Sequence, residues 1–237
     1  MSEQMKNHPK TDMTKITVHF FAPMYAAFDE QMTDLHLQRD AFLDHIVANE
    51  IFHLREDLAG KKLSQKANRH ISGELKRMGE EKLAKKSFNI RHSTADALNK
   101  VVEDHNLVRN AFFNLLVALL RSSDELLERL DLPKRVSRFR RDGTEDMPTS
   151  PLQGISEIQC DPLYYLRNAC QHRYGCGLYD MELPIGLHGF ACYLAEEHVP
   201  GTPANVKRLA EQKQEAALWA DLNLFENSLT PIAFKHV

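Results

Sequence analysis

The chain has 237 residues, 43% of them hydrophobic, and a formal net charge of −3, as expected for a globular protein. Its most apolar run, residues 111–120, is about half as long as the roughly 20 residues that a membrane-spanning helix needs. The N-terminal residues lack the apolar core of a secretory signal, and four cysteines are too few for a disulfide scaffold. We therefore expect a cytoplasmic protein of roughly two domains that has no membrane partner.

Charge is distributed unevenly along the chain. Residues 1–50 carry a net charge of −4, residues 51–141 one of +8, and residues 142–237 one of −7. A basic middle segment favours a polyanionic partner such as nucleic acid, although a solvated helix surface gives the same pattern. The acidic C-terminal part should avoid nucleic acid and contact proteins instead.

A short strand is the first element that the sequence predicts, after a polar tail, residues 1–14, that we expect to be disordered. Apolar Val18 and Phe20 alternate with other residues, which is the two-residue period of a strand with one buried face. Two helices should complete the segment 15–57. The residues expected on their buried faces are Phe28, Phe42, Ile46 and Val47, with His45 as a hydrogen-bonded interface residue.

Residues 58–85 should connect this segment to a second one. The connector is rich in Lys and Arg and predicts one basic helix, or two that break at Gly73 or Gly79. Its basic side chains are candidates for contact with a polyanion, and they include Lys61, Lys62, Lys66 and Arg69.

The second segment, residues 86–142, repeats the order of strand, helix and helix. Phe88 and Ile90 alternate with polar residues in its strand. Ser93 and Asp96 have the spacing of a capping box at the start of its first helix. The residues expected on the buried helix faces are Leu98, Val101, Val102, Phe112, Leu115, Leu116, Leu119 and Leu120.

An offset of 70 residues aligns the two segments without a gap. Residues 17–48 then lie over residues 87–118, and eight of the 32 positions are identical. Chance or helical bias alone would explain such identity, but the strand, first helix, break and second helix coincide as well. An isolated strand leaves backbone donors and acceptors unpaired, so we expect the two strands to pair. The predicted fold is mainly α with a short two-stranded antiparallel β-ribbon.

Each segment resembles the ribbon-helix-helix domain of the MetJ/Arc/CopG family. The stretch SFNIRHS, from Ser87, takes the place of the ribbon, and NLVRNAF, from Asn106, takes the place of the joint between the two helices. The resemblance covers residues 15–54 and 85–130. It implies an intramolecular tandem pseudo-dimer, followed by a small C-terminal domain, that binds double-stranded DNA.

The joint between the helices departs from the family pattern G-L-S-R-S-x-L. The first segment has His36 and Gln38 at the positions of the glycine and the first serine, and the second segment has Asn106 and Val108. Asn adopts the left-handed conformation of a glycine more readily than His does. Loss of the serine hydroxyl should weaken the phosphate contact that the family implies.

The outward residues of such a ribbon are the candidate base readers. A two-stranded ribbon fits the major groove of B-DNA, where Asn can pair with adenine, Arg with guanine, and Thr or Phe can contact the thymine methyl group. A polar edge strand that resists aggregation is the alternative interpretation. By the register of the repeat, the outward residues are Thr17, His19, Phe21, Ser87, Asn89 and Arg91. Because the two triplets differ, we expect an asymmetric target site.

Phosphate contacts are expected at the start of each second helix, where backbone amides and the helix dipole favour an anion. Arg39 and Arg109 fit this role, but they would equally fit ion pairs with acidic residues on the helix surface. The candidate phosphate-contacting residues are Gln38, Arg39, Val108, Arg109, Lys61 and Lys62.

The C-terminal third has a different character. Residues 143–154 are rich in turn formers and predict a linker, and residues 155–237 predict an acidic interaction domain. A helix should begin at Pro203 with Thr202 as its cap. This domain is expected to contact RNA polymerase or another regulator, and two molecules could associate side by side on DNA.

Cysteines and histidines gather in this third without a strong metal pattern. The spacings among Cys170, Cys176, His188 and Cys192 differ from the C-x2-C pairs of zinc sites. Buried thiols with ordinary histidines are the simpler interpretation, so we expect no metal and no cofactor. No common catalytic motif occurs, and we expect no enzyme.

The sequence therefore predicts a sequence-specific DNA-binding transcription regulator. Tandem copies in one chain with an appended domain resemble proteins of conjugative elements, namely plasmid-transfer activators and overdrive-binding virulence proteins of tumour-inducing plasmids. That resemblance favours activation of transfer genes. An accessory protein that binds near an origin of transfer, a repressor and an antitoxin are the alternatives.

Overall fold

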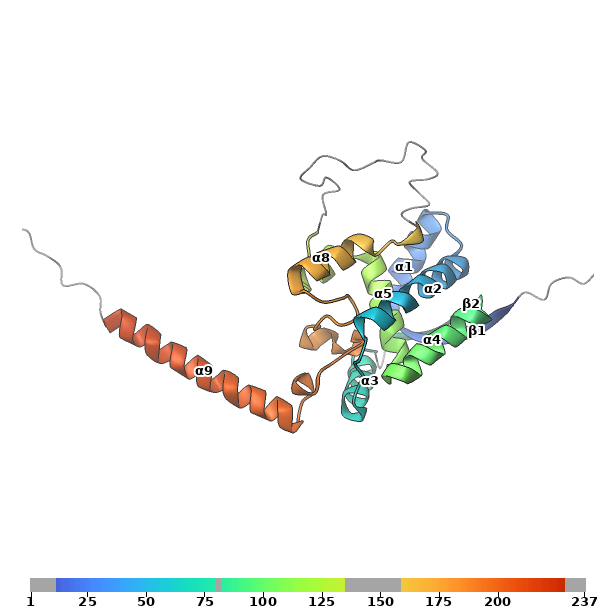
Figure 1. Ribbon diagram of the computed structural model, residues 1–237. Helices are drawn as coiled ribbons and strands as arrows, with labels where there is room; N and C mark the ends of the chain where they lie inside the picture. Colours follow the sequence, from blue (N-terminus) through green and yellow to red (C-terminus); the bar gives the residue numbers. More distant parts are fainter. Residues whose placement is uncertain (1–11, 80–81, 135–158, 229–237) are drawn as a thin grey trace, which may run out of the picture. The chain divides into compact units, whose positions relative to one another are not determined.

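The computed structural model describes residues 12–79, 82–134 and 159–228, with residues 217–228 described by their backbone. Within these residues the protein is mainly helical, and its two strands form one antiparallel sheet (Figure 1). The predicted class, mainly α with a short two-stranded ribbon, is confirmed. The described residues through Leu194 form one compact unit, and those from Ala195 onward form a second.

Strand β1, Met13–Phe21, pairs antiparallel with β2, Leu83–Arg91, and Thr17 lies opposite Ser87 at the centre (Figure 1). Each strand buries alternate residues, as the two-residue period predicts: Val18, Phe20, Phe88 and Ile90 are at most 1% exposed. Both strands begin earlier than expected. Cross-strand pairing therefore extends into the predicted tail at Met13 and into the predicted connector at Leu83.

Two helices follow each strand at matching distances. Helices α1, Ala22–Asp34, and α2, Arg39–Asp57, follow β1; helices α4, His92–His105, and α5, Arg109–Arg121, follow β2. The first residues of the two strands, of α1 and α4, and of α2 and α5 are each 70 residues apart. The two segments thus share the order and spacing that the repeat predicted.

The joints between the paired helices have the left-handed backbone of a glycine. His36 has φ 54° and Asn106 has φ 55°, in spite of the steric cost of a side chain there. The predicted capping box is wrong, because α4 begins directly after the strand: Arg91 is its N-cap and makes no side-chain cap hydrogen bond.

Helix α5 is the centre of the first unit. It packs against β1, α1, α3 and the 3-10 helix η1, Ile185–Phe190. The predicted stripe holds for Phe112, Leu115, Leu116 and Leu119. Residues on the helix's other sides are buried too, namely Ala111, Phe113, Asn114, Val117 and Ala118. A helix covered on all sides needs apolar residues all around, which explains its unusually apolar sequence.

Helix α3, Gln65–Gly79, is one continuous helix, and Gly73 lies within it. It packs on η1 so closely that a Cβ at Gly189 would lie 2.8 Å from the backbone nitrogen of Leu75. His70 and His188 hydrogen-bond across the same contact, with 3.2 Å between Nε2 and Nδ1. The connector helix is therefore held by the segment after residue 159.

That later segment belongs to the first unit, although the sequence suggested a separate domain from residue 155. It contains α8, Tyr164–Tyr174, and it follows α6, Asp124–Arg129, and the residues outside the described ranges. Glu50 on α2 is 0% exposed and accepts hydrogen bonds from both Arg167 Nη atoms and from the Tyr179 hydroxyl. Burial and the Glu50 carboxylate raise the pKa of Tyr179, so its phenol keeps the donated proton.

The second unit contains the 3-10 helix η2, Glu196–His198, and helix α9, Pro203–Ser228. The predicted cap is confirmed, because Thr202 Oγ1 accepts a hydrogen bond from the Asn205 backbone at 3.1 Å. Val206 and Leu209 on this helix are 60% and 44% exposed. No helix among the described residues is both long and apolar enough to cross a membrane.

Replacing Glu50 with Ala should strongly destabilise the first unit. The change leaves the guanidinium of Arg167 buried without its main partner, at a cost of about 3 to 5 kcal/mol of unfolding free energy. Chemical denaturation measures this loss. Glu56→Ala, an exposed change on the same helix, is the matched control and should change stability by less than about 0.5 kcal/mol. Equal stability of the two variants would contradict the anchoring role of Glu50.

Candidate nucleic-acid interface

The odd-numbered residues of β1 and β2 form the outer face of the ribbon, opposite the buried even-numbered residues. All six predicted base readers lie on this face, three on each strand: His19, Asn89 and Arg91 are exposed, and Thr17, Phe21 and Ser87 are partly buried. Sequence reasoning missed two exposed lysines on the same face. Lys15 lies opposite Asn89, and Lys85 lies opposite His19. The two-residue period would have included them had the strands been extended toward their starts.

The centre of the outer face is a hydrogen bond between the hydroxyls of Thr17 and Ser87, 2.9 Å apart. These two residues occupy the same position in the two segments, 70 residues apart. A chain position that pairs with its own repeat marks the local axis about which two antiparallel strands are related. The polar residues of the outer face are therefore arranged around Thr17 and Ser87.

The second helix of each segment completes the outer edge of the other segment's strand. Asp40 and Asp44 of α2 accept hydrogen bonds from the backbone N–H groups of Asn89 and Arg91, both at 2.9 Å. The residues 70 positions later, Asn110 and Asn114 of α5, accept from the backbone N–H groups of His19 and Phe21 at 3.3 and 2.8 Å. Side chains thus satisfy donors that an open sheet edge would leave exposed.

The acidic half of this arrangement also holds two base-reading candidates by their side chains. Asn89 Nδ2 donates to Asp40 at 3.1 Å, and Arg91 Nε donates to Asp44 at 2.6 Å. The Arg91 side chain is 50% exposed, and its remaining four N–H donors are on the two terminal nitrogens. A guanidinium fixed through Nε presents a pre-oriented fork to an external acceptor.

The two halves differ in charge although their backbones correspond. Asp40 and Asp44 face β2, whereas uncharged Asn110 and Asn114 face β1. Partial burial would raise the pKa of Asp40, but hydrogen bonds from the Asn89 backbone and from Arg39 lower it overall, so the carboxylate is charged at neutral pH. A polyanion would therefore meet a negative group on one side and an amide on the other.

The predicted phosphate-contacting residues lie at the starts of α2 and α5. Gln38 and Val108 are the N-caps, and neither makes a side-chain cap hydrogen bond. Of the two interpretations of Arg39, the ion pair with acids is the one observed, since its guanidinium contacts Asp29 at 3.2 Å and Asp40 at 2.9 Å. Arg109 is exposed at the equivalent place.

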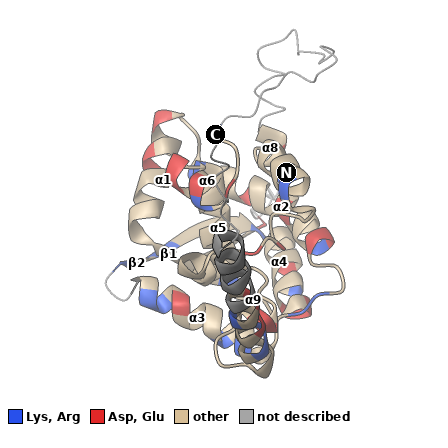
Figure 2. Ribbon diagram, turned by 90° about the vertical axis from the view of Figure 1, so that its left-hand side faces the viewer, with Lys and Arg blue, Asp and Glu red and all other residues tan. Residues whose placement is uncertain are grey.

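The two lysines of the connector have different surroundings. Lys61 forms an ion pair with Asp180, and its ammonium lies 5.4 Å from the centre of the Tyr193 ring. It therefore helps to hold the segment after residue 159 and is not placed for a phosphate contact. Lys62 is exposed. Figure 2 shows Lys and Arg on the end of α3 nearest the strands as well.

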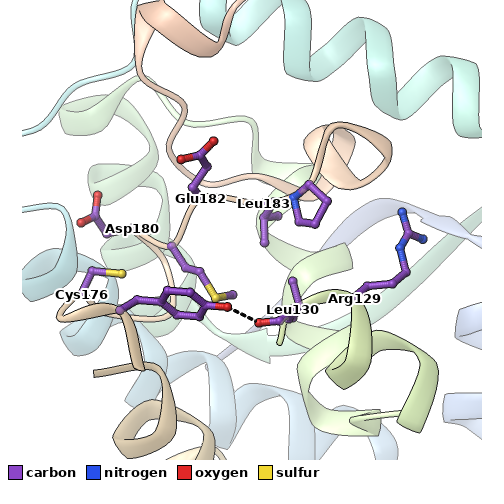
Figure 3. Close-up of a pocket in the computed structure, with 9 residues that line it drawn as sticks. Arg129, Leu130, Cys176, Asp180, Glu182 and Leu183 are labelled. Atoms are coloured by element: carbon purple, nitrogen blue, oxygen red, sulfur yellow. Dashed lines mark hydrogen bonds between the residues drawn. The ribbon is translucent and has the colours of Figure 1, made fainter. Parts of the chain in front are cut away.

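The cysteines do not converge with histidines. Among the described residues, no group of three or more His, Cys, Asp or Glu is arranged to hold a metal ion. All four cysteines are free thiols, and burial raises the pKa of Cys170 to about 12. Cys176 lines a pocket of about 480 Å³ between α6 and α8, where the Tyr174 hydroxyl donates to the Leu130 carbonyl (Figure 3).

Comparison with known proteins finds no matching family model, no matching curated protein and no matching solved structure. Functional interpretation therefore depends on the geometry of the ribbon and its charges.

A double-mutant cycle should detect the coupling between Asp44 and Arg91. Asp44→Asn keeps an acceptor for the Arg91 backbone, as Asn114 provides for Phe21, and removes the charge that faces the guanidinium. With Arg91→Ala as the second change, we expect a coupling of about 1 kcal/mol in unfolding free energy at low salt, because the pair is half exposed. The coupling should decrease as salt is added. Strictly additive effects at low salt would show that the contact does not form.

Proposed function

We propose that this protein is a sequence-specific double-stranded DNA-binding transcription regulator built as a tandem ribbon-helix-helix pseudo-dimer in one chain. The observation that supports this most is the antiparallel pairing of β1 with β2 around Thr17 and Ser87, which directs polar side chains of both strands to one exposed face. A two-stranded ribbon of this kind has the width to enter the major groove.

Base readout centres on the β2 half of the outer face. Asn89 can donate to adenine N7 and accept from adenine N6, while Arg91 can donate to guanine O6 and N7. Asp40 and Asp44 orient these side chains before DNA is bound, which lowers the entropy lost on binding. His19 and Phe21 occupy the corresponding positions of the other half, so the two halves read different sequences and the target is asymmetric.

Backbone contacts supply the sequence-independent part of the affinity. The first-turn amides of α2 and α5 are donors for phosphate oxygens, because neither helix has a side-chain cap. Lys15 and Lys85 add positive charge on the outer face. Neutralised phosphates release counterions, so affinity should fall steeply with salt.

The regulator activates transfer genes of a mobile element in this proposal, and the second unit contacts RNA polymerase or another regulator. The exposed Val206 and Leu209 on α9 are apolar residues suited to such a contact. Genome-wide mapping of bound sites tests this role. Binding at promoter regions supports transcription regulation, whereas binding confined to an origin of transfer would support a DNA-processing accessory protein instead.

Asn89→Ala and Arg91→Ala should each weaken binding to the selected DNA site by about 1 to 3 kcal/mol and relax the base preference at one position. The site is first selected from a random duplex library with the full chain, and affinities are then measured by gel shift or fluorescence anisotropy.

Arg55→Ala is the matched control, because Arg55 is an exposed arginine on α2 outside the outer face. It should leave affinity and base preference unchanged. If the ribbon variants bind the selected duplex as tightly and as selectively as the original chain does, the outer face does not read DNA.

A further inference from the structure

A groove of about 560 Å³ lies at one end of the ribbon, where three elements meet. His19 of β1 and Leu83 of β2 line it from the ribbon, and Val108 and Asn110 line it from the start of α5. The connector helix α3 forms the remaining wall with Ser72 and Lys76. The groove thus joins the outer face through His19, which belongs to both.

The lining has the chemistry of a site for one unit of a nucleic-acid backbone. Lys76 supplies an exposed ammonium, and Ser72 and His19 supply a hydroxyl and an imidazole, all able to donate to phosphate oxygens. Leu83 and Val108 add apolar surface against which a sugar can pack. No carboxylate is among the residues that line this groove.

Lys76 is better placed for this purpose than its neighbour. The guanidinium of Arg77 is paired with the Glu74 carboxylate one turn away on the same helix. The wall itself is fixed, because Leu75 is 4% exposed and its backbone lies against Gly189 of η1. A rigid wall presents the ammonium without a further cost for ordering the helix.

The corresponding region of the other half is less favourable for an anion. There, Asp40 occupies the position that Asn110 has beside the groove, and it is bonded to Asn89 and Arg39. Asp29, the other partner of Arg39, adds a second carboxylate. The charge along the ribbon therefore changes from basic at the α3 end to acidic at the α2 side.

We propose that the groove between α3, α5 and the ribbon binds one backbone phosphate of the DNA duplex, and that the protein grips its target on this side only. The inference rests on the proposed function and deepens it, because it assigns a phosphate contact to the connector helix. Base reading is then concentrated on the β2 half, and backbone anchoring on the α3 side, which fixes the direction of the protein on DNA.

The test compares Lys76→Ala with Lys66→Ala, an exposed lysine of the same helix that does not line the groove. The full chain is used with the duplex it selects from a random library, and with versions of that duplex in which single phosphates are replaced by neutral methylphosphonates. Lys76→Ala should weaken binding roughly fivefold for every sequence and reduce the slope of log affinity against log salt by about one. Lys66→Ala should do neither.

Methylphosphonates on one side of the site should weaken binding of the original chain and have no further effect on the Lys76→Ala variant. Equal affinities of the two lysine variants, or equal sensitivity to neutral phosphates on both sides, would overturn the one-sided grip. If Asn89→Ala and Arg91→Ala still impair binding in that case, the proposed function stands and this inference alone fails. If the full chain selects no duplex, both fail together.

Discussion

The antiparallel pairing of β1 with β2 is the interaction on which the rest of the first unit depends. Its central pair, Thr17 and Ser87, joins two segments whose elements begin 70 residues apart. The second helix of each segment then completes the edge of the other segment's strand. Separating the segments would leave strand donors without partners, so neither half of the ribbon is a stable unit by itself.

Charge is what makes the two halves unequal. At equivalent positions, Asp40 and Asp44 face one strand and Asn110 and Asn114 face the other. Hydrogen bonding to the backbone requires an oxygen acceptor, which both residue types supply, so the fold tolerates either. In the proposed function, this freedom serves recognition, because acids orient Asn89 and Arg91 while amides leave the opposite side open to phosphate.

Much of the ribbon and its helices could be predicted because local periods determine them. Alternating apolar residues predicted the strands, and the 70-residue offset predicted their pairing partner. The role of residues 159–194 could not be predicted in this way, since glycines interrupt their apolar pattern. Glu50 also has no signal in the sequence: a buried carboxylate looks like any surface glutamate until Arg167 and Tyr179 are placed beside it.

The most direct test of this account is a disulfide across the centre of the ribbon. The N–H groups of His19 and Phe21 point away from β2, so odd-numbered residues form the closer, non-hydrogen-bonded pairs, about 4.5 Å apart between Cα atoms. A Thr17→Cys, Ser87→Cys variant, with exposed Cys160 changed to Ser, should close this bond within one chain under mild oxidation in dilute solution. Mass spectrometry of a monomer bridged between residues 17 and 87 is the predicted result. Covalent dimers, or thiols at both positions that stay free, would contradict the pairing.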